Sequence, residues 1–201
     1  MRRSLLVGLV PALAFAAASL ASTKEAAAGP YLGVDLDLGT AFADRTGASN
    51  VDFSYGLGGR VGYKFEIPRS YVWILPEAGI HYMSFGTNAL NAGAIDHATT
   101  FNVGGRFGLK GLVQPNVFAH LGYGVLGSSL GGPAADIGAG IDFKLGRVFT
   151  LGAQIAYNTV TVTDTPLGLG TAQGSAKWVN FGLVSGFNFG APPARRTYYY
   201  R

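Results

Sequence analysis

Charged side chains that could form ion pairs recur at alternate positions, opposite large hydrophobic residues. Their acidic and basic members nearly balance. They would therefore suit either a narrow ion path or a buried ion-pair network that fixes strand alignment. We favour the network, because a pore of useful width normally takes more strands than the eight found below. The set comprises Asp35, Asp37, Arg60, Lys64, Glu77, Arg106, Lys110, Asp136, Asp142 and Lys144.

The three histidines do not have the spacing of a metal site. His81, His97 and His120 lie far apart, and none has a second ligand at metal-binding spacing. Ser84 follows His81 closely, but a separation of three residues puts them on opposite faces of a strand. The glycine-rich stretches precede no expected helix, which argues against phosphate binding. We therefore predict no catalytic residue, no metal and no cofactor.

The composition is unusual for a protein whose surface faces water. Of the 201 residues, 48% are hydrophobic, only 13% are charged and 31 are glycine, whereas a soluble domain carries about 25% charged residues. The absence of cysteine excludes disulfides, thiolate metal sites and a lipoprotein anchor. The formal charge of +4 includes no basic stripe interleaved with aromatic residues, which argues against nucleic-acid binding.

The N-terminus has the pattern of a secretory signal peptide. Arg2 and Arg3 precede an apolar run over 5–18, and Ser19-Leu20-Ala21 fits a small-residue cleavage pattern. We expect cleavage after Ala21, with Ala28 as a second site. A retained membrane anchor is the alternative, but the run is shorter than the roughly 20 residues that span a bilayer. The expected organisation is a signal peptide over 1–21, a single domain over 30–190 and a tail over 191–201.

Alternation with period two dominates the mature chain and predicts strands with two unlike faces. No later window has 18 consecutive apolar residues, as a membrane-spanning helix would need. We expect strands near 31–42, 51–65, 71–83, 99–109, 117–126, 136–145, 149–158 and 177–189.

The connections between these strands alternate in length. Short turns are expected at 66–69, 111–116 and 145–147, and longer loops at 44–50, 84–98, 127–134 and 160–176. An up-and-down antiparallel barrel with both termini on one side gives such an alternation. The sequence therefore predicts an all-β fold, an eight-stranded antiparallel up-and-down transmembrane β-barrel.

The apolar face should point outward, into lipid. About half of the opposite face is glycine, which weakens a water-exposed strand but leaves room inside a narrow barrel. Hydrocarbon offers no hydrogen bonds, so a membrane-spanning sheet must close on itself. Tyrosine and tryptophan near strand ends would form interfacial girdles, at Tyr31, Tyr63, Tyr82, Tyr123, Tyr157 and Trp178. The expected lipid-facing residues are Leu36, Leu57, Phe107, Leu121, Ile141, Leu151, Phe181, Phe187 and Phe189.

With Phe187 and Phe189 ending the last strand, the chain resembles the small bacterial outer-membrane β-barrels. That family includes the OmpA transmembrane domain, OmpX, OmpW and the opacity proteins. The resemblance covers about Tyr31 to Phe189 and rests on the signal peptide, strand count, loop alternation and Phe-rich last strand. It implies the Gram-negative cell outer membrane, with outer-membrane lipid, lipopolysaccharide and the barrel-assembly machinery as partners. The Tyr-rich basic tail departs from the family pattern, and we expect it to be periplasmic.

Three functions fit this architecture, since a fold alone does not fix activity. The first is a non-catalytic structural or surface-interaction (adhesin-like) role, with a filled lumen and long extracellular loops that contact a host or surface ligand. The second is a narrow, porin-like channel for small solutes or apolar molecules. The third is a lipid-modifying barrel enzyme. A soluble lipocalin-like barrel would instead need a hydrophobic lumen and a charged exterior.

Overall fold

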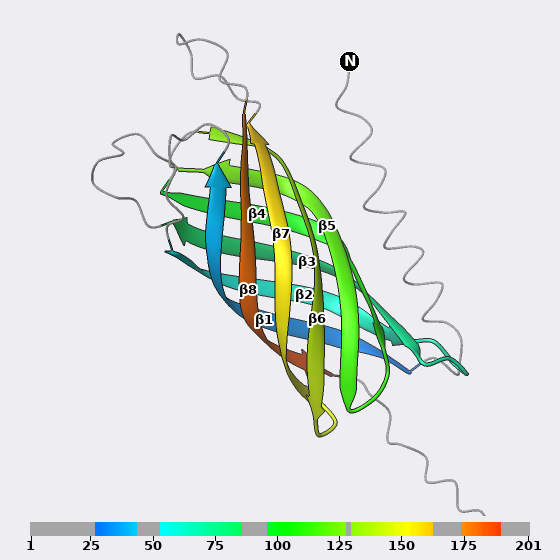
Figure 1. Ribbon diagram of the computed structural model, residues 1–201. Helices are drawn as coiled ribbons and strands as arrows, with labels where there is room; N and C mark the ends of the chain where they lie inside the picture. Colours follow the sequence, from blue (N-terminus) through cyan, green and yellow to red (C-terminus); the bar gives the residue numbers. More distant parts are fainter. Residues whose placement is uncertain (1–26, 44–52, 86–95, 128–129, 163–173, 190–201) are drawn as a thin grey trace, which may run out of the picture.

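The computed structural model describes residues 27–43, 53–85, 96–127, 130–162 and 174–189, and these form one closed barrel of antiparallel strands (Figure 1). This confirms the predicted fold. No helix in these ranges is long and apolar enough to cross a membrane. The eight strands are β1 (Ala27–Ala43), β2 (Phe53–Glu66), β3 (Val72–Phe85), β4 (His97–Leu109), β5 (Val113–Leu126), β6 (Leu130–Leu145), β7 (Phe149–Val162) and β8 (Gly174–Asn188).

Each strand pairs with its neighbours in chain order, and the last strand pairs with the first. We call this β1–β8 pairing the seam; it runs from Tyr31 opposite Asn188 to Ala43 opposite Ala176. In Figure 1, β1 and β8 accordingly lie side by side. The seam satisfies the outer backbone groups of both terminal strands, so the described sheet has no free edge. That is the condition for a sheet surrounded by hydrocarbon.

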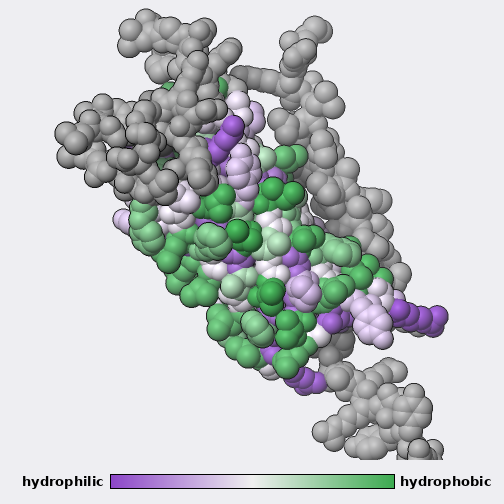
Figure 2. All heavy atoms as spheres, in the orientation of Figure 1, coloured by the Kyte–Doolittle hydropathy of each residue, from purple (hydrophilic) through white to green (hydrophobic). Residues whose placement is uncertain are grey.

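The two faces of the strands meet different environments. Arg60, Arg106 and Asp142 are buried inside the barrel, in the lumen. Figure 2 shows hydrophobic side chains over most of the visible barrel wall. The strands have 13 to 17 residues, more than the roughly 9–11 that cross a bilayer. Every predicted lipid-facing residue is exposed, from 37% for Phe187 to 70% for Leu121; the others are Leu36, Leu57, Phe107, Ile141, Leu151, Phe181 and Phe189.

The connection between β5 and β6 differs from the sequence prediction. A long loop was expected over 127–134, but β6 begins at Leu130, which pairs directly with Leu126. The prediction was wrong because Gly131, Gly132 and Pro133 have the composition of a loop. Pro133 instead lies within the strand with its ring exposed on the outer face. The alternation of long and short connections is therefore not strict.

The start of β5 also lies earlier than expected. Residues 113–116 were assigned to a turn, but the strand begins at Val113 and includes Pro115. Proline usually marks a turn or a strand edge because it cannot donate to a ladder. Here Pro115 faces outward and has a partner, Ile141, in β6. The turn between β4 and β5 is correspondingly short.

Two of the six proposed girdle residues lie inside the barrel. Tyr63, Tyr82, Tyr123 and Tyr157 are exposed on the wall, but Tyr31 and Trp178 are buried in the lumen. Their sequence parity explains this correction: Tyr31 is in phase with Asp35 and Asp37, and Trp178 is in phase with Asn180.

Several predicted features lie outside the described residues. These are the signal peptide over 1–21, the tail over 191–201, the loop over 44–50, and most of the predicted loops over 84–98 and 160–176.

Candidate functional site in the lumen

The middle of the lumen is filled by polar side chains from all eight strands. These positions alternate with lipid-facing ones, so the period of two that covers the outside with apolar residues also gathers the polar residues inside. The buried charged members are Asp35, Asp37, Arg60, Lys64, Glu77, Arg106, His120, Asp136 and Asp142, joined by the buried amides Gln114, Asn116, Gln154, Asn158 and Asn180.

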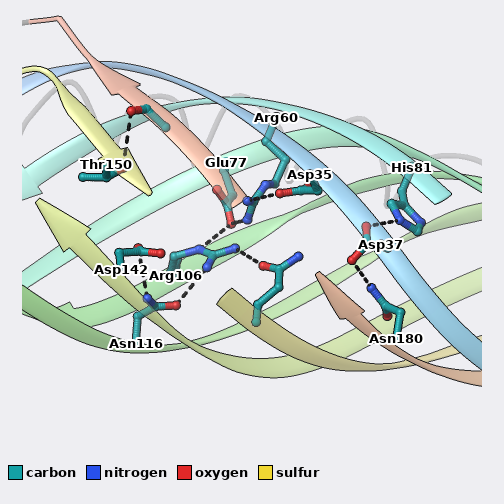
Figure 3. Close-up of polar contacts among 12 residues, drawn as sticks. Asp35, Asp37, Arg60, Glu77, His81, Arg106, Asn116, Asp142, Thr150 and Asn180 are labelled. Atoms are coloured by element: carbon teal, nitrogen blue, oxygen red, sulfur yellow. Dashed lines mark hydrogen bonds and ion pairs between the residues drawn. The ribbon is translucent and has the colours of Figure 1, made fainter. Parts of the chain in front are cut away.

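Glu77 of β3 lies where three cationic or potentially cationic groups converge. Its Oε1 atom is 3.6 Å from Nη1 of Arg60, 3.3 Å from Nε of Arg106 and 3.0 Å from Nε2 of His120. Figure 3 shows both arginines reaching toward this carboxylate from different strands. The side chain is almost fully buried. Because burying a carboxylate without a partner costs free energy, these neighbours are needed to stabilise Glu77.

Arg106 of β4 extends the network toward the short turns. Nη1 donates to Asn116 Oδ1 at 2.8 Å, and Nη2 donates to Gln154 Oε1 at 3.3 Å. The guanidinium carbon also lies 4.4 Å from the ring centroid of Phe118, within cation–π range. Asn116 in turn donates to Asp142 Oδ2 at 3.1 Å. Arg106 thus links β3, β5 and β7 to its own strand.

His120 of β5 bridges two carboxylates. Nδ1 is 2.6 Å from Asp136 Oδ1, and Nε2 is 3.0 Å from Glu77 Oε1. Asp136 also accepts from Nδ2 of Asn102 at 2.7 Å. A ring that carries a proton on both nitrogens would donate to both carboxylates. The bridge connects β3 to β6 across the barrel.

A second chain of contacts lies nearer the long-loop end. Asp37 of β1 is 2.7 Å from His81 Nε2 and accepts from Asn180 Nδ2 at 2.6 Å. Asn158 donates to Asn180 Oδ1 at 2.6 Å. Figure 3 shows Asp37 between His81 and Asn180. This chain joins β7 and β8 to β1 and β3, across the seam.

The predicted lysines divide into two groups. Lys64 is buried, donates to Gln114 Oε1 at 2.9 Å and lies 4.1 Å from the centroid of the Trp73 ring. Lys110 does not belong to the lumen network: its ammonium donates to the carbonyl of Ile67 at 2.6 Å, at a short turn. Lys144 is half-buried near the end of β6, with no ion pair among the described residues.

Among the described residues, two apolar clusters lie inside the barrel, one toward each end. The short-turn cluster comprises Tyr31, Trp73 and Leu75. The long-loop cluster comprises Met83, Ala98, Leu126, Ala134, Val160, Val162, Ala176 and Trp178. The long-loop cluster forms an apolar layer next to the polar middle, whereas at the other end Lys64 and Gln114 lie beside Trp73. An ion crossing the lumen would have to pass the packed polar middle and the apolar long-loop cluster.

The remaining space within the polar layer is small. A cavity of about 50 Å³ is lined by residues that include Asp35, Glu77 and His81. Such a volume accommodates only a few water molecules. Among the described residues, Glu77 Oε2, Asn102 Oδ1 and Arg60 Nε have no protein hydrogen-bond partner, and all three residues line this cavity. The cavity is a polar site for small hydrogen-bonding species, too small for an organic substrate.

Neither a metal site nor a Ser–His pair is formed in the described ranges. No group of three or more His, Cys, Asp or Glu side chains there has a metal-binding arrangement. His81 faces Asp37 in the lumen, whereas Ser84 is opposite Tyr55, which is exposed on the outer wall. The two side chains therefore belong to opposite faces of β3.

Sequence reasoning omitted several members of the network. His120 was considered as a metal ligand and not as a member of the network, and the amides of Asn116, Gln154 and Asn180 were not singled out. The signal for all four was parity, since each alternates with lipid-facing residues. Charge alone selected the predicted set, and uncharged hydrogen-bonding groups were missed.

Comparison with known proteins gives the family of the chain. Residues 7–189 match the family described as outer membrane protein beta-barrel domain. The chain belongs to this family. Its members' barrel fold agrees with the closed sheet seen here, and the family places the protein in the outer membrane of a Gram-negative cell. Among curated proteins no sequence matches this chain.

Solved structures of outer-membrane barrels share the fold. Neisserial surface protein A (NspA) is 14% identical, with a TM-score of 0.56, over 81% of this chain and 99% of that protein. Ail, the attachment invasion locus protein of Yersinia pestis, is 15% identical, with a TM-score of 0.50, over 80% and 99%. The outer membrane enzyme PagL is 15% identical, with a TM-score of 0.47, over 76% and 97%. At these identities the likeness extends to the fold alone.

Proposed function

We propose that this outer-membrane barrel has a non-catalytic, structural or surface-interaction role, and that its lumen does not conduct ions. The observation that carries this proposal is the filling of the lumen. Glu77, Arg106 and His120 cross-link the polar middle, which leaves a cavity of only about 50 Å³, and the apolar long-loop cluster lies beyond it. An ion entering from the long-loop end would lose its hydration in that apolar layer, at a cost of several kcal/mol.

The barrel wall then serves as a membrane anchor for whatever its loops present. β3 and β7 end opposite the short turns, where the segments 86–95 and 163–173 of the sequence join them to β4 and β8. In outer-membrane barrels the longer loops face outward, so these segments suit contact with a host or surface ligand or with lipopolysaccharide. Folding of the barrel would use the barrel-assembly machinery.

Conductance across a planar lipid bilayer tests the closed lumen. The folded protein should give no reproducible current steps, because the packed polar middle and the apolar long-loop cluster leave no open path. The control is the Trp178→Ala, Leu126→Ala double variant, which thins one apolar layer and should raise the background current if that layer is the barrier. Steady steps from the unmodified protein would instead identify a narrow channel.

Two cell-based measurements test the remainder of the proposal. Replacing 86–95 and 163–173 by Gly-Ser segments of equal length should reduce adherence of expressing bacteria to cultured host cells, while the heat-modifiable gel shift of a folded barrel persists. Equal adherence with and without the loops would remove the surface-interaction role.

Mass spectrometry of lipopolysaccharide and phospholipid from cells with and without the protein should show no change; a changed lipid would identify an enzyme.

A further inference from the structure

The three turns at one end of the barrel, β2–β3, β4–β5 and β6–β7, each carry a cation near an exposed apolar side chain. The β2–β3 turn has Arg69 beside Tyr71, which is 83% exposed. The β4–β5 turn has Lys110 two residues before Leu112, which is 72% exposed. The β6–β7 turn has Arg147 followed by the exposed Val148. These six residues are called the short-turn rim below.

Hydrogen bonds join neighbouring turns, so the rim is a continuous surface. The Lys110 ammonium donates to the Ile67 carbonyl at 2.6 Å, and the Lys110 backbone N–H donates to the Tyr71 carbonyl at 2.7 Å. The Lys144 N–H donates to the Leu112 carbonyl, and the Asn188 N–H donates to the Val148 carbonyl, both at 2.8 Å. These bonds fix the backbone of neighbouring strands where the three turns begin and end, and they fix the Lys110 ammonium beside the β2–β3 turn.

Arg69 occupies a backbone position that does not favour arginine. Its φ of 56° lies in the left-handed region, and it is the one non-glycine residue with positive φ among those described. Glycine or asparagine would be accommodated there with less strain. An arginine at this position is explained if its side chain has a role at the tip of the turn.

The charge at this end of the barrel is strongly asymmetric. Near the short-turn end the described residues include five cations, Lys64, Arg69, Lys110, Lys144 and Arg147, and two carboxylates, Glu66 and Asp142. At the opposite end the described charges include Asp96, which lies 2.8 Å from His97, and Lys177. Figure 2 shows hydrophilic side chains projecting from the short-turn end. The cations therefore concentrate on one side of the membrane.

We infer that the short-turn rim binds the headgroups of anionic phospholipids in the periplasmic leaflet. The short turns of outer-membrane barrels face the periplasm, where the adjoining leaflet consists of phospholipid. Arg69, Lys110 and Arg147 would meet the phosphates, and each cation near such a surface contributes about 1 kcal/mol. The exposed Tyr71, Leu112 and Val148 favour lipid over a cell-wall polysaccharide, because they can enter the boundary between headgroups and acyl chains.

Native mass spectrometry of the full chain tests this inference. The protein is released from nanodiscs that contain phosphatidylcholine and phosphatidylglycerol in equal amounts, and the ratio of the two retained lipids is measured. Phosphatidylglycerol should be enriched on the unmodified protein. Each of Arg69→Asn, Lys110→Gln and Arg147→Gln should lower that enrichment up to about fivefold, and the triple variant should abolish it.

Two controls keep the test specific. Asparagine suits the left-handed backbone of residue 69, so Arg69→Asn removes charge without backbone strain, and Arg69→Lys should restore much of the enrichment. Lys177→Gln removes a cation from the opposite end and should leave the enrichment unchanged. The inference is overturned if the triple variant retains the full enrichment, or if Lys177→Gln lowers it equally. It is also overturned if no lipid is enriched while the protein sediments with purified peptidoglycan.

Discussion

Arg60 of β2 donates to Asp35 of β1 at 2.5 Å, although the two residues are not partners in the sheet. Arg60 stands opposite Gly33 in β1 and Gly79 in β3, and Asp35 stands opposite Gly58. The long side chain therefore extends diagonally over positions that have no side chain. Charge pairing in this lumen depends on where glycine occurs as much as on where the charges occur.

Removal of Arg60 should be strongly destabilising. Arg60→Gln leaves Asp35 without its cation and removes one neighbour of Glu77, both buried. Breaking a buried ion pair in this way costs about 3–5 kcal/mol. Urea unfolding in lipid vesicles measures the change. The Asp35→Asn, Arg60→Gln double variant removes both charges and should recover most of the loss; an equally large loss in the double variant would contradict the assigned pairing.

Two glycines on different faces should respond differently to alanine. A Cβ at Gly79 would lie 2.9 Å from Arg60 Cγ and 2.9 Å from the Gly59 carbonyl, whereas a Cβ at Gly59 would meet nothing within 4 Å. Gly79→Ala should therefore cost about 1–3 kcal/mol through overpacking. Gly59→Ala should be neutral or slightly stabilising, since alanine restricts the unfolded chain more than glycine. Comparable losses at both positions would argue against a tightly packed lumen.

Two leucines on β5 test the apolar layer of the lumen. Leu126 is buried in the long-loop cluster, and Leu121 faces lipid. Leu126→Ala should leave a cavity and cost about 2–5 kcal/mol. At Leu121 acyl chains can fill the space, so Leu121→Ala loses the transfer term but leaves no cavity, and it should cost less than Leu126→Ala. The free energy of unfolding in lipid measures both variants. An equal or larger loss at Leu121 than at Leu126 would contradict the prediction.

Two equally exposed leucines test how the barrel sits in the membrane. Leu121 is 70% exposed in the middle of β5, and Leu112 is 72% exposed at a short turn. Arginine should cost about 2–4 kcal/mol at Leu121, where it meets hydrocarbon, and about 0–1 kcal/mol at Leu112, near the interface. Unfolding in phospholipid vesicles measures both variants. Equal tolerance of arginine would mean that β5 does not cross the membrane where proposed.

The architecture could be predicted from the sequence because it follows from one pattern, the alternation of apolar and polar residues. Alternation between residues such as Leu36 and Asp37 both defines a strand and assigns its faces, and a membrane then requires the sheet to close. The connection at 127–134 was mispredicted because Gly132 and Pro133 have the composition of a loop. Their place in β6 depends on pairing with β5, which is a tertiary effect.

The inner face of the barrel was predictable, but the full membership of the site and its contacts were not. The inner position of Glu77 or Arg106 follows from parity, but their pairing depends on how far each side chain reaches along the barrel. That reach depends on stagger between strands and on glycines such as Gly79. Tyr31 and Trp178 were wrongly placed in the interfacial girdles, because aromatic identity was given more weight than parity.

The seam has a consequence for how the protein is made. Tyr31 must find Asn188, at the far end of the described sequence, before either terminal strand has a complete set of backbone partners. A chain that stops before β8 would leave two open edges facing hydrocarbon, so shorter versions have no comparably stable resting form in the bilayer. Insertion therefore cannot be completed strand by strand during export. Until β8 is present, the two open edges of the incomplete sheet have no backbone partners from the chain itself.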